Sequence, residues 1–506
     1  LNKCNEFDTD SNPYVEILFP EHTAKLILDE EPPLGTCARL CVYPAGIKKA
    51  IISTDTDLLT NDDYHKYAKE VAASIKEELT IWIEHRCFSR RSRKGARNIL
   101  DVKWVGKWKK VKSKLDPTVM VRIIRMRLTL RGFKDMDANE IPTYAGTSSR
   151  LSQKLLVSEA VNNGWPIVAL DVSKAFLKGI SYEELASKTG EPERDVNFEL
   201  DSDAVAILRT LPGYEDFDPR VEVLHCDKPG TGCKDAPRAW SIQLTKATNE
   251  DFGLKSTTYD EQLVVRHTKE NKLDCIGTKH VDDVKAAGPA NVLAALIAVL
   301  EKHFGKGQID ITWNTFKSCG LQHTPFHSGY VLDQCEYIKA LKPIQHPELI
   351  STKNTDEAPA TLASLFLSLL MALAFSLQTR SDLCVYVVNL QRYAQKPKGI
   401  HVRRLNAIVR YAQANERKLT YWRLTGILIL EVHTDAGFRK EVDETGHCDG
   451  KALRGANFIL RQATLAMRNT VHLLDVTVGM LKQVTRSTFT SEGGALILAA
   501  DQAIVL

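Results

Sequence analysis

The sequence predicts an α+β protein built from several domains, and three observations point to this class. Its 506 residues would make two to four domains at roughly 100–200 residues per domain. Charged residues make up 26% of the chain and hydrophobic residues 43%, a globular composition that excludes disordered chains, collagen-like repeats and small disulfide scaffolds. Helical periodicity and strand-like alternation both recur along the sequence.

The first half of the chain contains predicted helices and strands after an irregular start. Residues 1–60 mix Pro, Gly and short apolar runs, and we interpret them as a linker or irregular extension. A helix should begin at Asn61, because two aspartates occupy its first turn and an apolar stripe follows at helical spacing. Strand-like alternation covers residues 119–130, and a helix over residues 149–162 leads into an apolar strand at residues 166–170. The stripe consists of Tyr64, Tyr67, Val71, Ile75, Leu79 and Trp82.

The second half contains further elements of both kinds and one long apolar run. A strand pair is predicted around residues 261–288, helices over 291–303 and 401–414, and a strand over 426–432. Residues 358–379 carry no charge and are long enough to cross a membrane. However, polar residues recur within this run at helical spacing and no aromatic belt flanks it, so we predict a buried core helix and no membrane association. These polar residues are Thr361, Ser364 and Ser368.

Charge is distributed unevenly along the chain. Residues 1–84 hold 8 Lys and Arg against 16 Asp and Glu, whereas residues 85–134 hold 17 against 2. Such a basic block indicates a partner rich in negative charge, with nucleic acid as the first choice, and the alternative is a solvated basic face. Trp104 and Trp108 lie inside the block, where they could stack on bases or pack beneath strands, and we favour packing.

The cysteines favour a reducing compartment. There are 11, scattered along the chain without a Cys-x-x-Cys pair, and no signal peptide is recognisable. Cys319, His323 and His327 have a spacing suited to a metal, but a hairpin turning at residues 325–329 is favoured over a metal site. The chain begins with Leu1, so we expect it to be a piece of a longer protein.

Three aspartates form the candidate catalytic group. Asp171 ends an apolar strand, and Asp282 and Asp283 lie at or near the turn of a predicted hairpin. Carboxylates brought together at neighbouring strand ends can hold two divalent metals, and Mg²⁺ suits ligands that are all oxygen. Each aspartate taken alone would be structural more often than not, because Asp favours turns.

The order of the motifs around these aspartates resembles the reverse transcriptase of copia-type long-terminal-repeat retrotransposons. The resemblance covers about residues 62–500. The residues that resemble the family's motifs are Lys-Trp-Val at 103–105, Arg-Met-Arg-Leu-Thr-Leu-Arg-Gly-Phe at 125–133, Leu-Asp-Val-Ser-Lys-Ala-Phe-Leu-Lys-Gly at 170–179, Lys-Asp-Ala-Pro-Arg-Ala-Trp at 234–240, His-Val-Asp-Asp at 280–283 and Gln-Thr-Arg-Ser-Asp-Leu at 378–383.

The resemblance implies an RNA-directed DNA polymerase with a right-hand fold of fingers, palm and thumb. It implies two-metal nucleotidyl transfer with Mg²⁺, or Mn²⁺ in its place, on a template-primer with deoxynucleotide triphosphates. Asp171, Asp282 and Asp283 would hold the metals, helped by the backbone carbonyl of Val172. Phe176 falls where the family's aromatic ring blocks a ribose 2′-hydroxyl, with core packing as the alternative. Residues expected at the substrate are Arg125, Arg127 and Arg131, which face phosphates, and Asp235, which replaces a Gln.

The resemblance also divides the chain and predicts its surroundings. The divisions are an extension over 1–60, the reverse transcriptase over 61–345, a connection segment over 346–425 and a ribonuclease H-like α/β domain over 426–506. Asp435 and Glu492 would be two of about four nuclease carboxylates, and we expect a truncated domain without ribonuclease H activity. The rest of a Gag-Pol-type polyprotein is the expected partner. The expected location is intracellular, in a cytoplasmic particle or the nucleus.

A second interpretation stays open, in which the chain is a retroelement relic that binds nucleic acid without polymerising. Two departures from the family pattern favour it. His280 replaces the usual Tyr before Val-Asp-Asp, and the carboxylate of Asp235 would repel a triphosphate unless a metal or an Arg offsets its charge.

Overall fold

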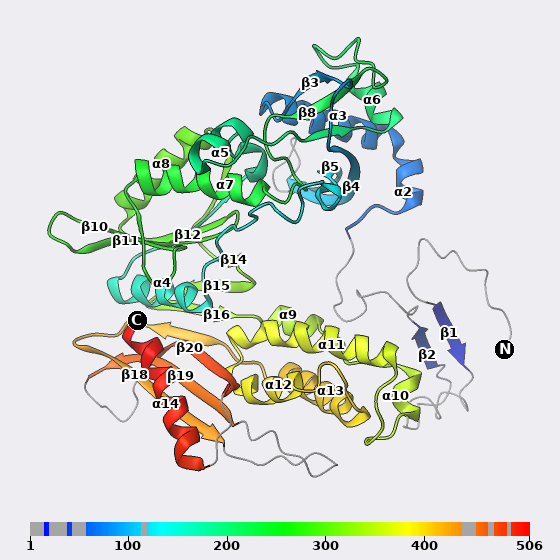
Figure 1. Ribbon diagram of the computed structural model, residues 1–506. Coiled ribbons are helices and arrows are strands. Elements are labelled where there is room, and N and C mark those ends of the chain that lie inside the picture. The colour runs from blue at the N-terminus through cyan, green and yellow to red at the C-terminus, as the bar shows by residue number, and fades with distance from the viewer. Residues whose placement is uncertain are drawn as a thin grey trace.

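A computed structural model describes residues 15–19, 38–42, 57–112, 119–437, 452–463, 470–482 and 487–505. From residue 57 onward these form two parts stacked one above the other (Figure 1). Strands β1 (Val15–Phe19) and β2 (Ala38–Val42) pair antiparallel, and most of the extension predicted over residues 1–60 lies outside the described residues. Helices and strands occur in both parts, so the predicted mixed α+β class is confirmed.

The helix predicted at Asn61 forms as two helices, α2 (Asn61–Lys66) and α3 (Ala68–Glu84). A capping box at Thr60 starts α2. The two helices are separated by Tyr67, whose φ of −114° and ψ of 35° leave the helical region. At this break the Tyr67 ring packs edge-on against Trp108, with ring centroids 5.1 Å apart.

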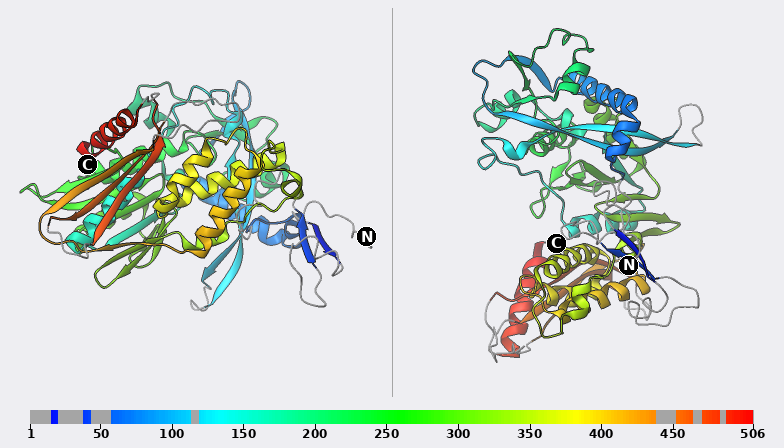
Figure 2. Two further views of the ribbon diagram at one scale, coloured as in Figure 1. Left: turned by 90° about the horizontal axis from the view of Figure 1, so that it is seen from below. Right: turned by 90° about the vertical axis from the view of Figure 1, so that its right-hand side faces the viewer.

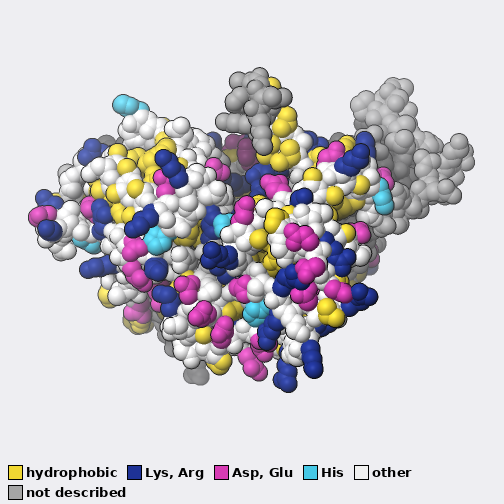
Figure 3. Space-filling view, turned by 90° about the horizontal axis from the view of Figure 1, so that it is seen from above, with side chains coloured by type: hydrophobic (Ala, Val, Ile, Leu, Met, Phe, Trp, Pro, Cys, Tyr) yellow, Lys and Arg dark blue, Asp and Glu magenta, His cyan; other side chains and the backbone are white. Residues whose placement is uncertain are grey.

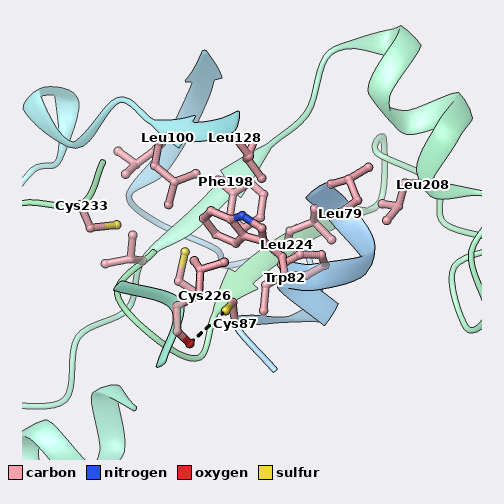
Figure 4. Close-up of a cluster of buried hydrophobic side chains, with 14 of the residues drawn as sticks. Leu79, Trp82, Cys87, Leu100, Leu128, Phe198, Leu208, Leu224, Cys226 and Cys233 are labelled. Carbon is pink, nitrogen blue, oxygen red and sulfur yellow. Dashed lines mark hydrogen bonds between the residues drawn. The ribbon is translucent and has the colours of Figure 1, made fainter. Parts of the chain in front are cut away.

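A five-stranded sheet packs against α3 in the upper part of the molecule. Its strands lie in the order β3-β8-β7-β4-β5. Strand β5, which pairs with β4 in a long ribbon, is the strand predicted at residues 119–130. Leu79 and Trp82 of α3 pack with Phe198 and Leu128 in the core of this part (Figure 4). Trp104 and Trp108 pack against the same core, as predicted. The bounds are β3 Phe88–Ser92, β4 Ile99–Lys112, β5 Met120–Leu130, β7 Asn197–Glu199, β8 Glu222–Cys226, α5 Tyr182–Thr189 and α6 Ser202–Leu208.

A six-stranded antiparallel sheet carries the candidate aspartates. Its order is β13-β6-β12-β11-β10-β9, and the strand and hairpin predicted around residues 166–170 and 261–288 are confirmed. Helices α7 (Ala236–Thr245) and α8 (Ala290–Phe304) cover one face. The strands are β6 Ile167–Val172, β9 Lys255–Ser256, β10 Leu263–His267, β11 Leu273–His280, β12 Asp283–Ala287 and β13 Ile309–Thr312.

Helix α4 (Arg150–Asn163) covers the opposite face of this sheet, close to its predicted bounds. Ser149 caps it by accepting a hydrogen bond from the Ser152 amide, and Gly164 ends it with a φ of 67°. Its residues belong to two different cores, one shared with the six-stranded sheet and one shared with the C-terminal sheet described below.

A small sheet of order β14-β15-β16-β17 lies between the two parts. Phe326 pairs with Gly329, so the hairpin predicted at residues 325–329 is confirmed. His323 is fully buried and stacks on Phe316, with ring centroids 4.6 Å apart. The bounds are β14 Phe316–Ser318, β15 Leu321–Phe326, β16 Gly329–Asp333 and β17 Leu419–Trp422.

Five helices of the lower part share one core. The predicted helix at residues 401–414 is α13, and the apolar run forms α11. By length and composition alone, residues Ala360–Gln378 could cross a membrane, and 33% of this stretch is buried. The helix is therefore buried on one face only, which differs from the predicted core helix; Leu367, Met371 and Phe375 on its other face are exposed. The helices are α9 Cys335–Ala340, α10 Pro347–Ser351, α11 Ala360–Phe375, α12 Cys384–Gln391 and α13 Gly399–Ala414.

The described chain ends in a three-stranded antiparallel sheet and a helix. The strands are β18 (Leu428–Gly437), β19 (Leu453–Gln462) and β20 (Val471–Met480), in that order. Helix α14 (Thr488–Val505) packs along this sheet (Figures 1 and 2). The strand predicted at residues 426–432 is confirmed and continues to Gly437.

Candidate active site

Three neighbouring strands place aspartates side by side. Asp171 in β6 pairs directly with Asp283 in β12, and on its other side with Asp310 in β13. Directly paired residues of neighbouring strands project to the same face of a sheet. The structure thus brings Asp171 and Asp283 together as predicted, and adds Asp310, an exposed residue that sequence reasoning missed.

Asp282 lies in the tight turn between β11 and β12. His280 pairs with Asp283, so only Val281 and Asp282 form the turn. Val281 has a φ of 58°, a conformation that is strained for a β-branched residue. The indole nitrogen of Trp240 donates a hydrogen bond of 2.9 Å to the Val281 carbonyl. Backbone strain is therefore concentrated at the turn that presents the candidate catalytic residues.

Replacing Val281 with glycine should stabilise the protein. Left-handed backbone costs a residue other than glycine about 1–3 kcal/mol, and glycine adds back roughly 0.5–1 kcal/mol of chain entropy. We expect Val281→Gly to raise the free energy of unfolding by about 1 kcal/mol, measured by urea denaturation. Val284→Gly, at a buried position of β12 without positive φ, should instead lower it.

Repulsion and burial act together on these carboxyls. Burial raises the pKa of Asp171, with further increases from Asp282 and Asp310, and Lys109 opposes them. Burial also raises the pKa of Asp283, with added repulsion from Asp282 and Asp171. The carboxylates therefore lie close enough to disfavour one another's ionisation, and a cation would relieve this cost.

The donor chemistry of this site fits Mg²⁺, which prefers oxygen ligands. Val172, whose carbonyl is the fourth predicted ligand, is the last residue of β6. Within the described residues, no three His, Cys, Asp or Glu side chains converge closely enough to hold an ion. Metal binding would therefore require the aspartate side chains to draw together.

The β4–β5 ribbon has one buried face and one basic face. Register pairs Trp104 with Leu128 and Gly106 with Met126, and these residues pack towards α3 and the core. Alternate residues project to the other face, which therefore carries five cations. Because Lys109 lowers the pKa of Asp171, this basic face lies towards the carboxylates. The five are Lys103, Lys107, Lys109, Arg125 and Arg127.

The other predicted cation, Arg131, is engaged within the protein. Its guanidinium lies 2.9 Å from Asp101, which also pairs with Lys134. Arg90 and Arg93 of the basic block form similar ion pairs with Glu222 and Glu199. Figure 3 shows acidic side chains interspersed among the basic ones on the top face of the molecule. Arg90, Arg93 and Arg131 are thus neutralised within the protein, and the basic face of the ribbon is the stronger candidate for phosphate contact.

Phe176 lies in a short 3-10 helix, η3 (Ala175–Lys178), just after β6. Its ring is half-buried and contacts the cores of both the five-stranded and the six-stranded sheets. Lys174, with a φ of 57°, starts this helix and pairs with the buried carboxylate of Glu78. The packing interpretation of Phe176 therefore has structural support, and a role beside a ribose stays a prediction.

Asp235 is buried beside Arg194. The Arg194 guanidinium pairs with Asp235 and also with Asp135, at 2.6 Å, and both carboxylate side chains are fully inaccessible. The Tyr182 hydroxyl donates to Asp235 at 3.3 Å. Burial raises the pKa of Asp235, and Arg194 opposes the increase. The Arg needed to offset this charge is thus present, and the side chain lies in the interior.

Asp435 and Glu492 lie at one end of the C-terminal sheet. Asp435 is exposed near the end of β18. At this end of the sheet Gly437 pairs with Leu453 of β19, and Leu453 pairs in turn with Met480 of β20. Gly494 in α14 lies beside Leu481, which follows Met480. Glu492 is therefore in the part of α14 that lies over the same sheet end. No other acidic residue of the described chain joins them in a metal-binding cluster.

Sequence comparisons relate the chain to retroelement polyproteins. No protein-family model matches it. The retrovirus-related Pol polyproteins from transposons RE2 and RE1 of Arabidopsis thaliana are each 23% identical to it, over 334 and 339 residues. Each alignment covers 63% of this chain and 21% of the relative, so the chain spans about a fifth of their length.

Among solved structures, a foamy viral protease–reverse transcriptase in complex with double-stranded DNA aligns with a TM-score of 0.42 and 10% identity, over 85% of this chain and 60% of that one. The RNA-dependent RNA polymerase of a human picobirnavirus aligns with a TM-score of 0.27 and 9% identity, over 63% and 66%. By sequence, the chain is a distant match to the Pol polyproteins of copia-type retrotransposons.

Proposed function

We propose that the chain is the RNA-directed DNA polymerase of a copia-type retrotransposon. The observation that carries this proposal is the pairing of Asp171 with Asp283 across adjacent strands, with Asp282 in the turn and the basic face of the β4–β5 ribbon nearby. The distant relationship to Pol polyproteins supports it. The right-hand division into fingers, palm and thumb, a connection segment and a ribonuclease H-like end belongs to the same proposal.

In this proposal Asp171, Asp282, Asp283 and the Val172 carbonyl would hold two Mg²⁺ ions, or Mn²⁺ in their place. Such ions would supply the charge that activates an attacking hydroxyl and stabilises the oxygen of the pyrophosphate leaving group. The chain's own cations, Arg125 and Arg127, attract the triphosphate and template backbone to the same place. Phe176 would border the sugar of the incoming nucleotide. Reaction of the primer 3′-hydroxyl at the α-phosphate then depends chiefly on positioning and charge.

Primer extension tests this function. The protein is incubated with poly(rA)/oligo(dT) and thymidine triphosphate, first with Mg²⁺ and then with Mn²⁺. We expect extension by the wild type and none by Asp282→Asn/Asp283→Asn, because the double variant loses two of three carboxylates. Template binding by both proteins, measured in parallel, should fall steeply with salt.

A second candidate function is nucleic-acid binding without catalysis. It is favoured by the carboxylates that do not converge on one point and by the buried, unpaired Nδ1 of His280, the last residue of β11 before the turn. Template binding without extension in either metal would select it over polymerisation. In both proposals the partner is nucleic acid, and we propose an intracellular location in a retroelement particle or the nucleus.

A further inference from the structure

A second tight turn lies beside the candidate carboxylates. Ser318 at the end of β14 pairs with Leu321 at the start of β15, so Cys319 and Gly320 alone form the turn. Their φ values are 50° and 76°, the two left-handed positions of a type I′ hairpin. Glycine takes this conformation without strain, whereas Cys319 holds it only if its surroundings impose it.

A buried hydrogen bond joins this hairpin to the strand that carries Asp283. Lys285 is two residues further along β12, so its side chain projects to the same face as that of Asp283. The fully buried Lys285 ammonium lies 3.0 Å from Nε2 of His323 in β15. Nδ1 of His323 donates to the Leu321 carbonyl at 3.0 Å, which leaves Nε2 free to accept from Lys285.

The Lys285–His323 contact joins two different sheets close to Asp283. Asp283 is two residues before Lys285 in β12, and Leu321, which directly follows the turn, is two residues before His323 in β15. The backbone amide of Cys319 lowers the pKa of Asp283, against the increase caused by burial, so the turn lies close to this carboxylate.

Residues at the C-terminal end of helix α11 contact this turn from the lower part of the molecule. The Phe375 ring packs directly against Gly320. A Cβ atom added to Gly320 would lie only 2.2 Å from Cζ of that ring. The Gln378 amide lies 3.5 Å from the carbonyls of both Cys319 and Phe375. The buried Gln334 side chain donates to the Phe375 carbonyl at 3.1 Å and fixes the helix end.

We propose that Phe375 and Gln378 are positioning residues for Asp283, acting through the Cys319–Gly320 turn. They hold the turn in the conformation that aims the Cys319 amide at the carboxylate, and so orient that carboxylate towards a divalent cation. Gln378 opens the Gln-Thr-Arg-Ser-Asp-Leu stretch, which this role connects to the site. The inference rests on the proposed function to the extent that Asp283 is taken as a metal ligand.

The expected size of the effect follows from comparable sites. Groups that hydrogen-bond a metal ligand usually change metal affinity or activity by about 10–100-fold when they are removed. Phe375 and Gln378 act one step further out, through the turn, so we expect the lower end of that range. The change should appear in cation affinity and in the rate of nucleotide addition at saturating substrate, with little change in KM for the nucleotide.

Binding of Mn²⁺ alone, followed by electron paramagnetic resonance, is the first test. We expect Phe375→Ala and Gln378→Ala to bind Mn²⁺ about tenfold more weakly than the wild type. Met371→Ala is the matched control, because Met371 is an exposed apolar residue one turn earlier on the same face of α11. It should bind as the wild type does. Phe375→Leu keeps an apolar contact on Gly320 and should restore most of the affinity.

A second readout follows the turn itself. Cys319 is half-buried, whereas Cys87, Cys226, Cys233, Cys275, Cys335 and Cys384 are buried. Its alkylation by iodoacetamide can be measured on its own peptide by mass spectrometry. Alkylation should accelerate in Phe375→Ala and stay unchanged in Met371→Ala. The two proposals fail differently: a wild type that binds Mn²⁺ but extends no primer removes the proposed function and leaves this inference standing. Equal Mn²⁺ affinity in wild type and both folded variants, or no Mn²⁺ binding by the wild type, overturns the inference.

Discussion

Asp171→Asn should abolish nucleotide addition while making the protein slightly more stable. The ligand lost is the carboxylate on which the metal site depends, and metal stabilisation of a transition state is worth several kcal/mol. Because each 1.36 kcal/mol changes a rate tenfold, the rate should fall at least about a thousandfold. In the same variant, like charges no longer face each other across β6 and β12. We expect roughly 0.5–1 kcal/mol of added stability at pH 7.

The pH dependence separates this electrostatic effect from a packing effect. The pKa of Asp171 is raised in the folded protein, so its ionised form costs stability once the pH exceeds the ordinary value of 3.8. The difference between variant and wild type should therefore grow as the pH rises through the raised pKa, and should vanish below 3.8. Asp310→Asn removes the charge on the other side of Asp171 and should show the same trend in stability. A stability difference that does not change with pH would contradict this explanation.

Arg194→Met should strongly destabilise the protein. It leaves the carboxylates of Asp135 and Asp235 without their shared partner, and both are fully inaccessible. Breaking a buried ion pair by removing one partner costs about 3–5 kcal/mol. Urea denaturation measures the loss. The loss should shrink as the pH is lowered, because protonation then neutralises the stranded carboxyl of Asp235, whose pKa is already raised by burial.

Two further variants test the cause of this loss. Arg238→Met breaks a more exposed pair with Glu191, 2.8 Å apart, and should cost less than about 1 kcal/mol. Asp235→Asn, added to Arg194→Met, removes one stranded charge and should recover part of the stability. Equal losses in Arg194→Met and Arg238→Met would show that the buried carboxylates do not dominate.

Local signals made several elements predictable from the sequence. The cap at Ser149, the aspartates after Thr60 and the glycine after α8 act over three or four residues, and the corresponding helix ends lie within two residues of the predicted bounds. The hairpin around Asp282 was predictable because its alternation and turn residues are contiguous. The pairing of Asp171 with Asp283 was expected through a resemblance to a family, since no local signal joins residues 112 positions apart.

Features that depend on distant partners were not predictable. Asp310 reaches Asp171 only because β13 lies at the sheet edge beside β6. Arg194 meets Asp235 across 41 residues of chain, so burial of that carboxylate had no signature in the sequence. The break at Tyr67 is likewise tied to its contact with Trp108, because periodicity alone favours an uninterrupted helix. In each case the deciding contact is long-range, and propensity carries no information about it.

Helix α4 has a consequence for how this chain can be rearranged in evolution. Its Ser158 hydroxyl lies 2.8 Å from His472 of β20, its Asn162 amide oxygen accepts from the Leu424 amide at 3.0 Å, and its opposite side packs under the six-stranded sheet. One helix therefore has to match two surfaces at once. If recombination replaced the C-terminal sheet with one from another lineage, the new sheet would pack against an α4 whose side chains fit the original sheet. The two halves are thus expected to be inherited together, and to diverge by paired changes along α4.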